Sequence, residues 1–116
     1  LEELAFGSDR AKASASAAAL ALEKGDNERA FSLATQGRLW DPTVERAIVT
    51  QVIALLKLKR LEEARALTAT EVRDPKVAAR LLGLRGAVLN EQGNFAEAEQ
   101  LLRLSADRLR ELGEGP

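Results

Sequence analysis

The sequence contains no cysteine, histidine, methionine or tyrosine. Without cysteine the chain has no disulfide, no thiolate nucleophile and no thiolate ligand for zinc. Without histidine it lacks the side chain that most often serves as a general base near pH 7 and as a metal ligand. No phosphate-binding loop or nucleophile–base pattern is present either. We therefore expect no enzymatic activity, no catalytic residue, no cofactor and no metal site.

Aromatic residues make up only 3% of the chain, and 17 basic residues against 18 acidic residues give a net charge of −1. So few rings cannot form a base-stacking surface, and the balanced charge does not attract a phosphate backbone or an anionic membrane. No apolar run approaches the roughly 18 residues of a membrane-spanning helix. We expect neither a nucleic-acid partner nor a membrane, and a cytoplasmic location.

A length of 116 residues is enough for one modest domain. The chain begins at Leu1 rather than at a methionine, and the start lacks the basic residues of a signal peptide. We expect a fragment of a longer protein or a processed product. The bias toward Ala, Leu, Arg, Glu and Gly favours a GC-rich bacterial genome.

Three segments of the sequence resemble one another. They close on Ala30, Ala64 and Ala98, and each alanine follows one or two charged residues. The spacing between successive alanines is 34 residues in both intervals. A fixed period of this length indicates one supersecondary unit that is stacked on itself.

Proline and aspartate mark where the units meet. Asp41-Pro42 and Asp74-Pro75 combine a residue that caps helices well with one that fits the first helical position. Both pairs therefore predict the start of a helix.

Each unit is predicted to contain two helices. Gly25 and Gly93 are placed to end the first helix in a left-handed conformation, and Asp26 and Asn94 to cap the second. Glu97 follows Asn94 by three residues, a spacing that predicts a capping box. No strand-like alternation is present. The predicted helices cover residues 10–24, 27–38, 43–58, 61–73, 76–92 and 95–112.

These units resemble the tetratricopeptide repeat, a helix–turn–helix unit of 34 residues. The residues that carry the resemblance are Leu82, Gly86, Leu89, Gly93, Phe95 and Ala98 in the third unit, Ile48, Leu55, Leu61 and Ala64 in the second, and Ala18, Gly25, Ala30 and Pro42 in the first. The resemblance implies an all-α right-handed superhelix of six antiparallel helices, with a concave face lined by the first helix of each unit. It also implies protein binding. The predicted division is an N-terminal flank (1–9), one solenoid domain (10–112, with repeats near 11–44, 45–78 and 79–112) and a tail (113–116).

One predicted helix, 43–58, is apolar on two faces. Val49, Ile53 and Leu56 form the second face, which in the repeat geometry points into the concave groove. The alternative interpretation of these three residues is ordinary core packing. Applied to all units, the same rule predicts a groove made of small and aliphatic side chains with a charged rim: Ala15, Ala19, Leu22, Arg46, Val49, Ile53, Leu56, Lys57, Arg80, Gly83, Ala87, Asn90 and Glu91.

The last predicted helix, 95–112, carries a leucine-rich surface, which we expect to be partly covered by a neighbouring domain, a second copy or further repeats. Three hypotheses for function follow. The first is a module that binds an apolar peptide or helix in the groove. The second is a regulatory or sensor segment of a larger bacterial protein, such as a transcription activator. The third is a self-assembly scaffold that forms a homo-oligomer.

Overall fold

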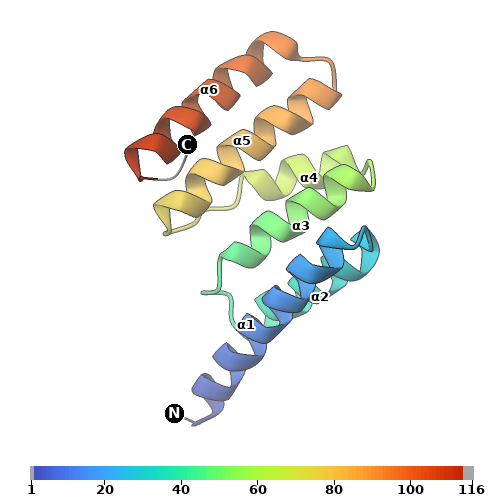
Figure 1. Cartoon of the computed structure of the whole chain (residues 1–116), viewed down its shortest axis with the longest axis vertical. Helices are drawn as coiled ribbons and strands as arrows, with labels where there is room; N and C mark the ends of the chain where they lie inside the picture. The colour runs from blue at the N-terminus through green and yellow to red at the C-terminus, as the bar shows by residue number, and fades with distance from the viewer. Residues whose placement is uncertain (1, 114–116) are drawn as a thin grey trace.

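The computed structural model describes residues 2–113, and these form six helices and no strand. The prediction of an all-helical chain with six helices is confirmed. The helices are α1 (Glu2–Glu23), α2 (Asn27–Trp40), α3 (Arg46–Lys57), α4 (Leu61–Thr68), α5 (Pro75–Glu91) and α6 (Phe95–Glu111), as Figure 1 shows.

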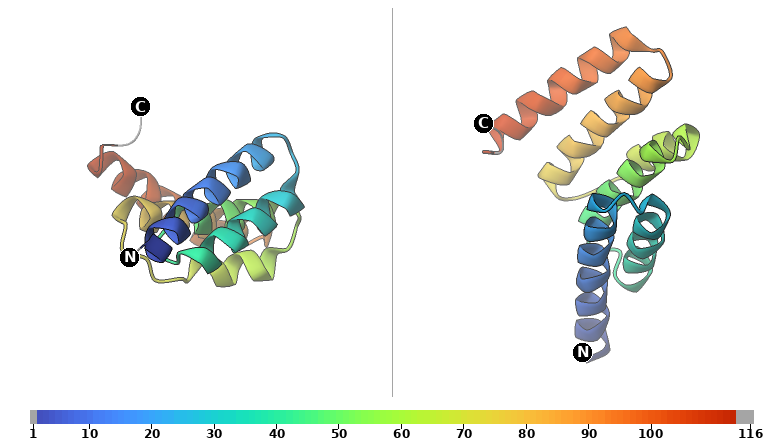
Figure 2. Two further views of the ribbon diagram at one scale, coloured as in Figure 1. Left: turned by 90° about the horizontal axis from the view of Figure 1, so that it is seen from below. Right: turned by 45° about the vertical axis from the view of Figure 1, so that its right-hand side comes forward.

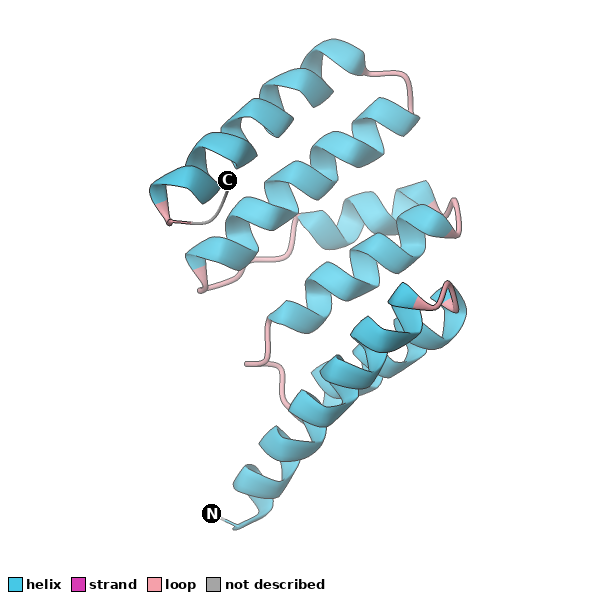
Figure 3. Cartoon of the chain, viewed as in Figure 1, coloured by secondary structure: helices cyan, strands magenta, loops and turns pink. Residues whose placement is uncertain are grey.

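Successive helices run in opposite directions and form three hairpins, α1–α2, α3–α4 and α5–α6 (Figure 1). Figure 2 shows the hairpins following one another in chain order, and Figure 3 shows that short loops join all six helices. Beyond contacts between consecutive helices, α3 packs against α1 and α5 packs against α3. Among the described residues the backbones of α2 and α4 do not approach each other, nor do those of α4 and α6. The odd-numbered helices therefore lie side by side along one layer.

This arrangement is elongated. Its principal extents are 48 × 30 × 25 Å, with a radius of gyration of 14.5 Å. A globular domain of the same length has a radius of gyration of about 13 Å. The difference follows from adding hairpins along one direction rather than around a single centre.

The 34-residue period recurs in the boundaries of the helices. The first helix of each hairpin ends at Glu23, Lys57 and Glu91, and the second begins at Asn27, Leu61 and Phe95. Both sets are spaced by 34 residues. The sequence period is thus a period of structure.

The turn inside each hairpin has the same backbone in all three copies. Its central residue is left-handed, with φ of 81° at Gly25, 61° at Lys59 and 85° at Gly93. The residue that follows donates its N–H to a carbonyl five positions earlier, in the pairs Asp26 to Ala21, Arg60 to Leu55 and Asn94 to Leu89, over 2.8–2.9 Å. This is the Schellman arrangement, which satisfies carbonyls left open at a helix end. The left-handed ends predicted at Gly25 and Gly93 are confirmed, and Lys59 adopts the same conformation without being glycine.

The two Asp-Pro pairs behave differently. Asp74 caps α5 as predicted, because its carboxylate accepts the N–H of Lys76 at 2.8 Å and Pro75 is the first helical residue. The prediction for Asp41-Pro42 is wrong, since α3 begins only at Arg46. The Asp41 carboxylate instead accepts hydrogen bonds from the hydroxyl and N–H of Thr43, at 2.6 and 2.9 Å, which form a turn. These bonds also hold the pKa of Asp41 below its usual value of 3.8.

Other predicted boundaries also change. The first helix begins at Glu2 and so includes most of the predicted flank, and α4 ends at Thr68 rather than at residue 73. Asp26 caps α2 through the N–H of Arg29, as predicted. The capping box at Asn94 is wrong, because the Asn94 side chain makes no capping bond. The Asn94 N–H, which Glu97 would need, is already donated to Leu89.

The largest core cluster lies between the second and third hairpins. It joins α3 and α4 to α5 through the buried aliphatic residues Ile48, Val52, Leu55, Ala64, Val77, Leu81 and Val88. The first hairpin is attached to α3 by two clusters whose buried members are all alanine: Ala15, Ala18, Ala34 and Ala47, and Ala21, Ala30 and Ala54. Leu22, Phe31, Leu33 and Val44 pack half-buried against them. Alanine buries much less apolar area than valine or leucine, so this junction contributes less stability.

The turn at Lys59 leads to a stability prediction. A left-handed conformation costs a residue with a Cβ about 1–2 kcal/mol, and glycine avoids that cost. Glycine also has more conformational freedom in the unfolded chain, which lowers stability by about 0.4–1 kcal/mol. Lys59→Gly is therefore expected to raise the free energy of unfolding by up to about 1 kcal/mol.

The matched control is Gly93→Ala. A Cβ at Gly93 meets no atom within 4 Å, so its effect is conformational alone. It is expected to lower the free energy of unfolding by about 1 kcal/mol in urea titrations. A destabilised Lys59→Gly chain would show that Lys59 contributes more through its side chain than its backbone costs.

Candidate functional site

Two hollows follow one another along α3, α5 and α6. The first has a volume of about 420 Å³ and is lined by Val49, Ile53, Arg80, Gly83, Leu84, Ser105 and Leu109. The second has a volume of about 340 Å³ and is lined by Leu56, Lys57, Lys59, Ala87, Asn90, Glu91 and Leu102. We call the surface that joins them the apolar groove.

The walls and floor of the apolar groove come from three helical stripes. Val49, Ile53 and Leu56 recur at helical spacing on α3 and form one wall. Gly83 and Ala87, four residues apart on α5, form the floor. The opposite wall consists of the α6 residues Leu102, Ser105 and Leu109. The first hollow is thus mainly aliphatic, whereas the second combines Leu56, Ala87 and Leu102 with charged and polar side chains at its rim.

Two glycines of α5 allow α6 to lie close to this floor. A Cβ at Gly83 would lie 2.7 Å from the Ser105 hydroxyl, which donates a hydrogen bond to the carbonyl of Ala79 at 2.7 Å. A Cβ at Gly86 would lie 2.9 Å from Cγ of Leu102. Neither position has room for a side chain without movement of α6. The glycines therefore fix the separation of the two helices that bound the groove.

A third hollow, of about 880 Å³, lies at the end of the groove where α3 and α5 begin. Arg46 lies at this end, and its guanidinium donates to the carbonyl of Lys12 at 3.2 Å and to the hydroxyl of Ser16 at 3.4 Å. The Glu45 carboxylate accepts the backbone N–H groups of Arg73 and Asp74 at 2.8–3.0 Å. That acid is therefore already satisfied by backbone groups.

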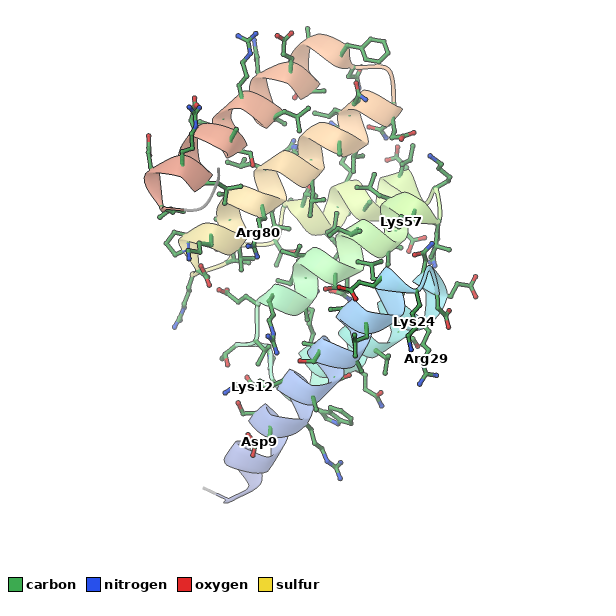
Figure 4. All side chains as sticks on the ribbon, viewed as in Figure 1. Asp9, Lys12, Lys24, Arg29, Lys57 and Arg80 are labelled. Carbon is green, nitrogen blue, oxygen red and sulfur yellow. The ribbon has the colours of Figure 1, made fainter. Side chains whose placement is uncertain are left out.

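Cations mark both ends of the groove. Figure 4 shows Lys12 and Arg80 near the N-terminal end of α3 and Lys57 near its C-terminal end. Beside Lys57, the ammonium of Lys59 lies 3.3 Å from the carboxylate of Glu91. This ion pair is exposed, so it contributes little stability. It joins the turn that follows α3 to the end of α5 at the rim of the second hollow.

Most of the predicted groove residues come together in this region. The first hollow contains Val49, Ile53, Arg80 and Gly83, the second contains Leu56, Lys57, Ala87, Asn90 and Glu91, and the third contains Arg46. The alternative of ordinary core packing for Val49, Ile53 and Leu56 is true in part, because all three are half-buried.

The groove residues predicted in the first unit are placed elsewhere. Ala15 is buried between α1 and α3, which corrects its assignment to an open groove. Leu22 is half-buried against the second alanine cluster, and Ala19 is exposed without lining a described hollow. The reason is that α3 packs directly on the alanine stripe of α1.

The prediction missed the wall supplied by α6 and the contribution of Leu84. Leu102 and Leu109 belong to the leucine-rich surface that the sequence indicates, but their spacing does not say that they face α3 across α5. Leu102, Leu104 and Leu112 are 38–44% exposed.

Within residues 2–113, no group of three or more acidic, histidine or cysteine side chains is placed to hold a metal ion. None of the described helices combines the length and hydropathy needed to cross a membrane. Comparison with protein-family models and with curated proteins found no match.

The glycine floor can be tested by Gly86→Ala. The added methyl group meets both Leu102 and the carbonyl of Ala98, at 2.9 and 3.1 Å, which outweighs the gain in helix propensity. The free energy of unfolding is expected to fall by about 1–2 kcal/mol in thermal or urea unfolding.

The control is the double variant Gly86→Ala/Leu102→Ala, which removes one of the two contacts. The loss in free energy of unfolding caused by Gly86→Ala is measured in the Leu102→Ala chain and in the natural chain. It is expected to be smaller by at least about 1 kcal/mol in the Leu102→Ala chain. Simple additivity of the two substitutions would contradict the proposed contact.

Proposed function

We propose that this chain is a protein-binding module of the tetratricopeptide type, and that the apolar groove holds a helix or peptide of a partner. The observation that carries the proposal is the groove itself, in which aliphatic walls on α3 and α6 flank the small residues Gly83 and Ala87. Apolar grooves of this kind bind the apolar face of amphipathic segments. The 34-residue register of turns and helix ends supports the family assignment.

The dimensions of the groove favour a short helix. From Arg46 to Lys57, α3 spans about 16 Å at 1.5 Å per residue, which equals three helical turns. Ala87 adds little side-chain bulk to the floor, whereas Gly83 is covered by Ser105 of α6. A helix of about 11–12 residues with an aliphatic stripe fits this space.

The charge at the ends sets the orientation of the partner. Arg46 and Lys12 lie together at one end, and the nearby carboxylate of Glu45 is already occupied by two backbone N–H groups. An acidic residue at one end of the partner helix is therefore favoured there. Such peripheral charge pairs act on orientation and association rate more than on affinity.

The proposal is tested by panning a displayed library of random 15-residue peptides on the immobilised chain. Enriched peptides are expected to carry an apolar stripe at helical spacing. Ile53→Glu puts a charge in the aliphatic wall and is expected to weaken their binding at least tenfold, about 1.4 kcal/mol, by fluorescence anisotropy.

The matched control is Leu39→Glu, because Leu39 is 78% exposed on α2 and lines none of the three hollows. It is expected to leave peptide binding unchanged. Circular dichroism must show both variants folded. Equal binding by both variants, or no enrichment of peptides, would overturn the groove as the binding site.

A further inference from the structure

Each end of the row of hairpins exposes an apolar helical face. On α1, Ala13, Ala17 and Leu20 recur at helical spacing; Ala13 is exposed, Ala17 is half-buried, and Leu20 is 57% exposed. On α6, Leu102 is 44% exposed, and Ala106 lies four residues further on the same face. We propose that these faces bind each other in two copies of the chain, so that α1 of one copy packs on the α5–α6 hairpin of the next.

The chain contains the template for this contact. Inside the molecule, α3 packs on the α1–α2 hairpin through fully buried alanines of one stripe. Ala47 packs with Ala15, Ala18 and Ala34, and Ala54 packs with Ala21 and Ala30. The face of α3 that makes this contact is the one directed toward the preceding hairpin.

The 34-residue register identifies the matching residues at the two ends. One period before Ala47, Gln51 and Ala54 stand Ala13, Ala17 and Leu20. These positions are buried on α3, whereas on α1 none of the three is buried. The face on α1 is therefore equivalent to the α3 face that packs on the first hairpin, but on α1 no hairpin covers it.

The same register identifies the surface that receives it. Two periods after Ala15, Ala18 and Ala34 stand Gly83, Gly86 and Leu102. The contact of Gly86 with Leu102 reproduces the pairing of Ala18 with Ala34, which confirms the equivalence of the two hairpins. At these three positions one leucine side chain of four carbons replaces three alanine methyl groups, so the volume there is nearly conserved. In the second cluster the contact is larger, because Leu20 and Leu89 stand where the internal junction has Ala54 and Ala21.

At the place of Gln51 polar groups do not oppose the contact, whereas the same register brings Lys12 of one copy beside Arg80 of the next. In the internal junction, Gln51 bonds to Arg38 at 2.8 Å and to Thr35 at 2.9 Å. At the corresponding places between copies stand Ala17, Ala106 and Arg103, and the guanidinium of Arg103 is paired with Glu99 at 2.6 Å. Ala17 of one copy and Ala106 of the next therefore meet where Gln51 and Arg38 form buried hydrogen bonds in the internal junction. Alanine has no polar side-chain group, so neither residue leaves one unsatisfied.

The contact joins two different faces and is therefore heterologous, so that copies add head to tail into open rows. The receiving surface shares Gly83 and Leu102 with the apolar groove, but Ile53 on the opposite wall lies outside it. Stacking therefore does not require the proposed peptide binding but competes with it for Gly83 and Leu102, and Ile53→Glu separates the two.

The absence of cysteine allows a direct crosslinking test. Ala17→Cys and Ala106→Cys chains are prepared separately, mixed, and treated with a short bismaleimide crosslinker. The crosslinker is needed because the positions equivalent to Ala106 and Ala17 in the internal junction are bridged by the long side chains of Arg38 and Gln51. The mixture is expected to give at least ten times more covalent dimer than either variant alone. Ala17→Cys mixed with Gln100→Cys, an exposed position on another face of α6, is expected to give none.

Three outcomes of the crosslinking experiment would overturn the proposal. Equal product from one variant alone would indicate a symmetric contact, and no dimer in the mixture would show that the two faces do not meet. Loss of product when Ile53→Glu is added to both chains would show that the groove, not the α5–α6 surface, joins the copies.

Sedimentation of the natural chain is expected to show a mass that rises with concentration above 12.5 kDa. A constant mass of 12.5 kDa at millimolar concentration would also contradict stacking.

Discussion

Beside the half-buried face that lines the groove, the helix α3 has two buried faces, and the neighbouring helices are arranged so that both are covered. Ala47 and Ala54 face the first hairpin, whereas Ile48, Val52 and Leu55 face α4 and α5. Burial of a valine or leucine side chain contributes about 1.5–3 kcal/mol, and Val52 and Leu55 are fully buried. The middle hairpin cannot cover both faces by itself, so it depends on a neighbour on each side.

This dependence divides the molecule into parts of unequal stability. The fully buried side chains of largest volume, Leu55, Leu89, Val52 and Val88, all lie on α3 and α5. The buried residues that attach the first hairpin are alanines, which bury little area, and its larger apolar side chains there are only half-buried. The rigid part of the structure is therefore the one that forms the apolar groove, since α3, α5 and α6 supply its walls and floor.

The repeat and the helices could be predicted from sequence because the determining signals are local and recur three times. The period predicts the turn even at Lys59, which stands where the other two units have glycine. The hydrogen bond from Arg60 to Leu55 imposes the left-handed turn that glycine adopts in the other two units. The start of α3 could not be predicted, because Asp41 bonds to Thr43 and Glu45 bonds to the start of α5, and this last contact is distant in sequence.

The groove was predicted only in part, because one of its walls also depends on contacts that are distant in sequence. Stripes on α3 and α5 are visible in the sequence, whereas the approach of α6 depends on Gly83 and Gly86 meeting Ser105 and Leu102.

Native-state hydrogen exchange, resolved by residue, tests most directly the claim that α3 is the shared core of three stacked hairpins. The account predicts that amides near Val52 and Leu55 on α3 exchange only through global unfolding. Amides of α1 near Ala15 and Ala18 are predicted to exchange through openings of lower free energy, because alanines hold this helix to α3. Protection of α1 equal to or greater than that of α3 would contradict the account.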